Sequence, residues 1–141
     1  MSRTFGLVVA VAAALAAPGT GVAREGGLVA KPRLELRAMP HMAFSPAEVR
    51  VVGRLVGGED HAEFYCPAFE WDWGDGGRSL RESDCPPFGD ETKMARVFSV
   101  AHHYREPGEF SVRLTLRRAG RVVAIASAPV RILGRQGEEG L

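Results

Sequence analysis

Apolar and polar residues alternate along most of this chain. The clearest case is residues 110–117, where apolar side chains fall on one side of the pattern and polar ones on the other: Phe110, Val112, Leu114 and Leu116 against Ser111, Arg113, Thr115 and Arg117. Successive side chains of a β-strand point to opposite faces. This segment therefore predicts a strand with one dry and one wet face.

The same alternation predicts further strands at residues 34–38, 48–55, 69–73, 96–104 and 122–133. Two of these have apolar faces made of Val49, Val51 and Leu55, and of Phe98, Val100, His102 and Tyr104. Turn signals rich in glycine and proline separate the strands, and residues 78–92 are predicted to form a long polar loop. No segment shows sustained helical periodicity. Six or seven short strands joined by turns predict an all-β sandwich.

The N-terminal residues have the layout of a secretory signal peptide. Arg3 precedes an apolar run of 13 residues, and small residues follow at 21–23. The run is shorter than the roughly 20 residues of a membrane span. We expect cleavage after Ala23, which divides the chain into a signal peptide at 1–23, a flexible lead-in at 24–33, one domain at 34–133 and a disordered tail at 134–141.

This leader predicts a secreted or periplasmic protein. No cysteine lies near the cleavage site, so we expect no lipid anchor. Since no second long apolar run follows, we also expect no membrane span in the mature chain. Without Arg3 the chain holds 17 basic and 17 acidic residues, which gives no electrostatic reason to expect nucleic acid or an anionic membrane as a partner. Cys66 and Cys85 predict a disulfide in an exported chain, with two free buried thiols as the alternative.

Two blocks, "FEWDWGDGG" and "VAHHYREPGEFSVRLTL", resemble in this order the pattern of the PKD domain family. Its members are immunoglobulin-like β-sandwiches of secreted and cell-surface proteins. The likeness covers about residues 34–133, although residues 78–95 are longer than the family's usual connection and the cysteine pair is an addition. The matching positions are Trp71, Asp72, Trp73, Gly74, Asp75 and Gly76, then His102, Tyr104, Pro107, Gly108, Phe110, Val112, Leu114 and Leu116.

The resemblance implies one immunoglobulin-like sandwich of about seven antiparallel strands. It also implies no catalytic residues and no cofactor, because PKD domains serve as spacers, interaction modules or accessory domains beside hydrolases. The sequence itself agrees with a non-catalytic role, since it contains no catalytic-nucleophile, zinc-binding or phosphate-loop motif. We expect a non-enzymatic module that binds an extracytoplasmic protein or polysaccharide, with a structural subunit of a larger envelope assembly as the alternative.

Acidic residues beside aromatics raise the question of an active or metal site. Trp71 and Trp73 share one strand face and Asp72 lies on the other, while Asp75 between glycines suits a turn whose carboxylate accepts backbone N–H bonds. Calcium is an alternative, with Asp84, Asp90 and Glu91 as further oxygen donors, but it needs six to eight oxygens. A glycosidase would need two carboxylates facing across a cleft, which this spacing does not indicate.

The remaining polar residues suggest structure or surface. His102 is expected in the core, bonded to backbone, with His103 facing solvent on the opposite side. His41 and His61 are expected in loops, with no metal-ligand partner at a recognisable spacing. Tyr104 resembles the tyrosine that ties a corner of sandwich folds through its hydroxyl. Candidate binding surfaces are the loop at residues 78–84 and the polar outer face with Glu70, Asp72, Arg113 and Arg117. The alternative for Arg113 and Arg117 is an ordinary solvated sheet face.

Overall fold

The computed structural model describes residues 30–135. The predicted signal peptide, most of the lead-in and most of the tail lie outside these residues, and the domain boundaries stay predictions. The described part contains eight strands and one short 3-10 helix: β1 (Arg33–Met39), β2 (Met42–Phe44), β3 (Ala47–Val56), η1 (Ala62–Phe64), β4 (Ala68–Asp72), β5 (Arg78–Arg81), β6 (Val97–Tyr104), β7 (Gly108–Arg118) and β8 (Arg121–Leu133).

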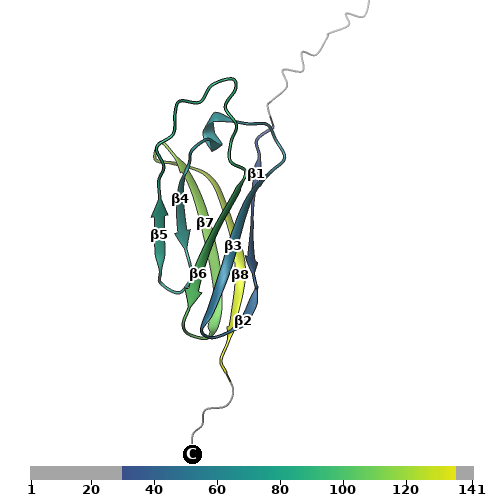
Figure 1. The fold of residues 1–141 in the computed structure, drawn as a ribbon, viewed down its shortest axis with the longest axis vertical. Helices are drawn as coiled ribbons and strands as arrows, with labels where there is room; N and C mark the ends of the chain where they lie inside the picture. Colours follow the sequence, from purple (N-terminus) through teal and green to yellow (C-terminus); the bar gives the residue numbers. More distant parts are fainter. Residues whose placement is uncertain (1–29, 136–141) are drawn as a thin grey trace, which may run out of the picture.

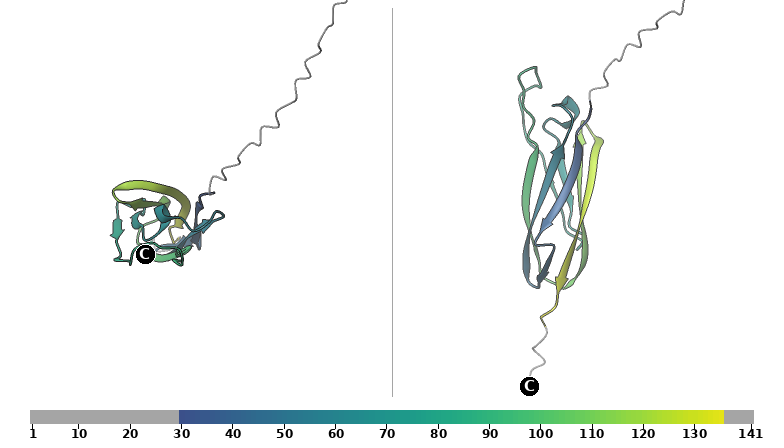
Figure 2. Two further views of the ribbon diagram at one scale, coloured as in Figure 1. Left: turned by 90° about the horizontal axis from the view of Figure 1, so that it is seen from above. Right: turned by 90° about the vertical axis from the view of Figure 1, so that its right-hand side faces the viewer.

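These strands form two facing sheets (Figures 1 and 2). One has three strands in the order β1-β3-β6, and the other has five in the order β2-β8-β7-β4-β5. Neighbouring strands are antiparallel, except that β2 runs parallel to β8. Two mainly antiparallel sheets packed face to face, with connections that cross between them, define the architecture. The chain is an immunoglobulin-like β-sandwich.

The predicted fold class is therefore confirmed. Seven strands pair antiparallel, and β2 is an eighth that the sequence did not predict, because three residues are too few to show an alternation. The core is made by the predicted apolar faces: Val49, Val51, Val112, Leu114 and Leu116 are each 0% exposed. Within residues 30–135, no helix has the length and apolar character needed to cross a membrane.

One prediction about a segment was wrong. Residues 78–92 were expected to form a loop, but Arg78–Arg81 form β5, which pairs with β4 in a hairpin. All four residues of β5 are exposed, so no apolar alternation marks the strand in the sequence. Thr115 alternates with the core residues Leu114 and Leu116, as predicted, yet it is only 8% exposed. It lies on a central strand between Glu70 and Ile125, whose longer side chains flank it in register.

The cysteine pairing is as predicted. Cys66, just before β4, and Cys85, just after β5, form a disulfide across a sequence separation of 19 residues. The bond ties the segment after β5 to the entry of β4. It therefore fixes one end of the β4–β5 hairpin, which lies at the edge of the five-stranded sheet.

Candidate functional site

The two sequence blocks meet in space and join the two sheets. Trp71 and Trp73 are both 4% exposed, and their rings stack with centroids 5.3 Å apart. On the other side of Trp73, the ring of His102 from β6 stacks at 4.4 Å. The aromatic stack thus runs from the five-stranded sheet to the three-stranded sheet.

Asp75 and His102 form the polar contact of this joint. His102 Nε2 lies 2.7 Å from Asp75 Oδ2, and the Gly77 N–H donates to Asp75 Oδ1 at 2.9 Å. The expected backbone partner of His102 was wrong: the ring meets a carboxylate instead. Burial raises the pKa of Asp75, but the hydrogen bonds from His102 and Gly77 outweigh it, so the pKa lies below its ordinary value.

Tyr104 connects the same joint to β7. Its hydroxyl donates to the Trp73 carbonyl at 2.8 Å, and its ring lies 4.6 Å from that of Phe110. Burial and the charge of Asp75 raise the pKa of Tyr104 to about 12. A Cβ on Gly108 would meet the Phe110 ring at 2.8 Å, so glycine leaves the space in which this ring lies.

The aspartates and histidines of interest are engaged with protein groups. Asp72 accepts from the Gly74 N–H at 3.1 Å and pairs with Arg78 at 3.2 Å. His61 caps η1 by accepting from the Glu63 N–H, while His103 is exposed, opposite in direction to His102. In residues 30–135, no group of three or more His, Cys, Asp or Glu side chains could hold a metal ion.

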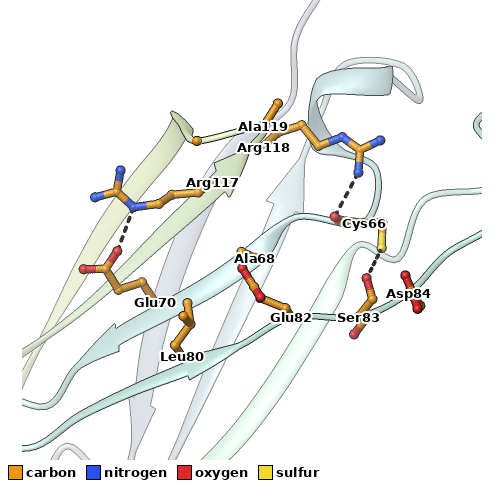
Figure 3. A pocket seen from close by; sticks show the side chains of 11 residues that line it. Cys66, Ala68, Glu70, Leu80, Glu82, Ser83, Asp84, Arg117, Arg118 and Ala119 are labelled. Carbon is orange, nitrogen blue, oxygen red and sulfur yellow. Dashed lines mark hydrogen bonds and ion pairs between the residues drawn. The ribbon is translucent and has the colours of Figure 1, made fainter.

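The outer face of the five-stranded sheet carries a shallow hollow of about 670 Å³ at the end of the β4–β5 hairpin (Figure 3). Arg117 Nε donates to Glu70 Oε2 at 2.7 Å, and Arg118 donates to the Cys66 carbonyl at 3.2 Å. Cys66 Sγ contacts the Ser83 carbonyl, although a disulfide sulfur has no proton to donate. Glu70 and Arg117, both predicted surface residues, thus form an ion pair with each other.

A second hollow, of about 600 Å³, lies between the two sheets. It exists because the sheets differ in width. The inner face of β5 extends beyond the three-stranded sheet, so Ser79 and Arg81, which are paired in register with Trp71 and Phe69, have no strand opposite them. We call this space the β5–β6 groove; it is lined by Phe64, Tyr65, Cys66, Pro67, Phe69, Trp71, Ser79, Arg81, Ser83, Cys85, Lys93, Ala95, Val97, Phe98, Ser99 and Val100.

The β5–β6 groove combines an apolar floor with basic rims. Phe69 and Phe98 meet edge to face on the floor, with centroids 4.6 Å apart. Arg81 and Lys93 are exposed, and among the described residues that line the groove there is no Asp or Glu. An apolar hollow with a few convergent polar groups is the usual form of a binding site.

Sequence reasoning pointed to the two hollows only in part. The segment 78–84 was a candidate: it lines the outer hollow with Leu80, Glu82, Ser83 and Asp84, and the β5–β6 groove with Ser79, Arg81 and Ser83. Phe69, Phe98 and Lys93 were not singled out. Their place in the groove depends on the unequal width of the two sheets, which no local sequence pattern encodes.

The comparisons with known proteins assign no family to this chain. No family model matches the chain. No curated protein matches it. Among solved structures, the chain is similar to a CARDB domain of a Pyrococcus furiosus protein, which was crystallised in complex with di-metal ions. The two share 15% sequence identity over 73% of this chain and 90% of that one, with a TM-score of 0.48.

Proposed function

We propose that this chain is an exported, non-catalytic, PKD-like module that binds a partner macromolecule, a protein or a glycan. The observation that carries the proposal is the β5–β6 groove. It presents an apolar floor and two cations beside a rigid core, and the disulfide at Cys66 and Cys85 fixes its border. A disulfide suits an oxidising compartment outside the cytoplasm.

The PKD motif has a structural role in this proposal. Trp73, Asp75, His102 and Tyr104 use their polar groups on one another or on the backbone, so they build the sandwich and leave binding to the groove. No member of this set offers a free nucleophile or a pair of facing carboxylates. The likeness to PKD domains supports an accessory or interaction role rather than chemistry.

The proposal is tested by affinity capture from an envelope extract of the native cells. We expect the wild-type chain and Arg113→Glu, altered on the outer sheet face, to retain the same partner. Arg81→Glu, altered in the groove, should lose it. Equal capture by all three proteins would show that the groove is not the binding surface.

A structural subunit of an envelope assembly is the second candidate. The observation in its favour is that both β5 and β6 end their sheets with unpaired edges within the described residues, and such edges can pair with neighbouring chains. Size-exclusion chromatography separates the two: a monomer over a wide concentration range favours the binding module, and concentration-dependent growth favours assembly.

A further inference from the structure

We propose that the β5–β6 groove receives an extended, acidic peptide segment of a partner protein, which pairs with β6 as a fourth strand of the three-stranded sheet. This inference rests on the proposed binding function and narrows it to one class of ligand. It follows from the direction of the β6 backbone groups, the character of the edge and the charge of the groove.

The free edge of β6 carries hydrogen-bonding groups that no strand of residues 30–135 pairs with. The Leu55 N–H donates to the Arg96 carbonyl at 2.8 Å, and Leu55 stands opposite Arg96 when the β3–β6 register is continued. Hydrogen-bonded pairs recur every second residue in an antiparallel ladder. The even-numbered residues of β6 therefore bond to β3, and Val97, Ser99 and Ala101 direct their N–H and C=O groups away from the sheet.

This edge lacks the features by which proteins usually block strand pairing. Edge strands are blunted by charged side chains, by proline or by extreme shortness. Strand β6 has eight residues, VFSVAHHY, with no Lys, Arg, Asp, Glu or Pro. The other sheet edges are protected: β1 carries three charged residues in RLELRAM, β2 has three residues, and β5 has four, two of them Arg.

The overhang of the larger sheet supplies the opposite wall. A strand added beside β6 would face the inner side of β4 and β5, where Phe69, Ser79 and Arg81 have no strand opposite them. Alternate side chains of an added strand would then enter the groove, as in known modes of strand addition. Val97, at 59% exposure, would be covered by the new strand.

The positive charge of the groove favours an acidic segment as its occupant. Arg81 and Lys93 line the groove without a neighbouring carboxylate among its described lining residues, and Arg50 reaches Ser99 Oγ on the outer side of β6 at 3.5 Å. A second copy of this chain would bring the same cations to a two-fold interface, which disfavours self-pairing. A segment that alternates apolar and acidic residues can pack on the apolar floor, place carboxylates near the cations and pair its backbone with β6.

The direct test uses a synthetic peptide of about eight residues, a typical strand length, that alternates valine and glutamate. We expect the full chain to bind it in fluorescence anisotropy and to bind the valine–lysine counterpart at least about tenfold more weakly. A valine–glutamate peptide methylated at alternate backbone nitrogens should also lose binding. These peptide controls use the wild-type chain and need no variant to fold.

Two proline variants show which edge is used. Ser99→Pro removes an N–H that faces the free edge of β6 and leaves the bonds to β3 in place, so binding should fall about tenfold or more. Leu80→Pro makes the same change on β5. The Trp73 N–H bonds to the Gly77 carbonyl, so the odd-numbered residues of β5 bond to β4 and the Leu80 N–H faces the free edge. It should leave binding within about twofold, with circular dichroism showing that both variants are folded.

Several results would overturn the inference. Equal binding of the valine–glutamate and valine–lysine peptides, binding that survives backbone methylation, or binding insensitive to Ser99→Pro would each exclude strand addition at β6. Self-association that Ser99→Pro abolishes would identify a second copy as the occupant instead. If capture of the native partner requires Arg81 but ignores Ser99→Pro, the binding function stands and strand addition fails. If capture requires neither, both fail.

Discussion

At the scale of single residues, the stability of the sandwich depends on polar groups that connect the two sheets. Asp75, in the turn after β4, meets His102 of β6, while the Tyr104 hydroxyl reaches the Trp73 carbonyl. A buried hydroxyl and a partly buried carboxylate are favourable only while their partners remain.

Tyr104→Phe should lower the free energy of unfolding by about 1 kcal/mol, because the Trp73 carbonyl loses its buried donor while the ring packing is kept. Urea unfolding followed by the fluorescence of Trp71 and Trp73 measures this. Tyr65→Phe is the matched control, since it removes an exposed hydrogen bond to the Pro86 carbonyl. It should change stability less, and an effect of Tyr104→Phe no larger than that of Tyr65→Phe would refute the role of the Tyr104 hydroxyl.

Asp75 should make stability depend on pH in the acid range. Its folded-state pKa is lowered, so its ionised form stabilises the fold above the ordinary aspartate pKa of about 3.9. That contribution should disappear as the pH falls through the lower, folded-state pKa. Asp75→Asn should cost about 1 kcal/mol near neutral pH, because the charge-assisted bond from His102 is lost.

The measurement is the urea midpoint of wild type and Asp75→Asn from about pH 7 down to about pH 2, a range that spans the titration of aspartate. The two midpoints should differ near neutrality and converge in acid. Asp90→Asn, in the exposed loop after β5, should follow the wild type throughout. A constant gap between wild type and Asp75→Asn at every pH would contradict the linkage.

At the scale of elements, the direction of the backbone groups explains why a proline is tolerated inside a long strand. Pro129 lies within β8, between two other strands, yet it costs no ladder bond. The Arg131 N–H bonds to the His41 carbonyl and the Ser45 N–H to the Leu133 carbonyl, so odd residues of β8 face β2. Because β2 pairs only with residues 131–133, the nitrogen of Pro129 faces an unpaired stretch.

The β4–β5 turn offers a similar test at Gly74 and Gly76. Both have positive φ, at 79° and 89°, which strains any residue with a Cβ. A Cβ on Gly74 would also meet the Ser111 backbone at 2.9 Å, whereas nothing lies within 4 Å of one on Gly76. Gly74→Ala should cost roughly 2 kcal/mol and Gly76→Ala about 1 kcal/mol. Thermal or urea unfolding measures both, and equal costs would show that the approach of β7 is not tight.

At the scale of the whole molecule, the sequence predicted the layers but not their relative width. Alternation located β3, β6 and β7 and their core faces, because burial of one sheet face leaves a period of two. It missed β5, whose exposed residues carry no such period, and it could not show that β5 extends beyond β6. The groove depends on that offset, so Phe69, Phe98 and Lys93 could be recognised only in three dimensions.

The motif "WDWGDGG" illustrates the same division. Its tryptophans and turn aspartate could be assigned to structure from spacing alone. The contact of Asp75 with His102 could not, since it joins residues 27 positions apart, one in the β4–β5 turn and the other on the three-stranded sheet. The proposed function rests on the groove between the two sheets, while the residues of the motif hold the sheets together.

The most direct test of the account is amide hydrogen exchange, resolved by residue in NMR, on the full chain with and without the valine–glutamate peptide. We predict that the peptide slows exchange at the outward-facing amides of β6, those of Val97, Ser99 and Ala101, and leaves the outward-facing amides of Arg78 and Leu80 on β5 unchanged. Protection confined to β5 or to the outer face of the five-stranded sheet, with the β6 amides unaffected, would contradict the account.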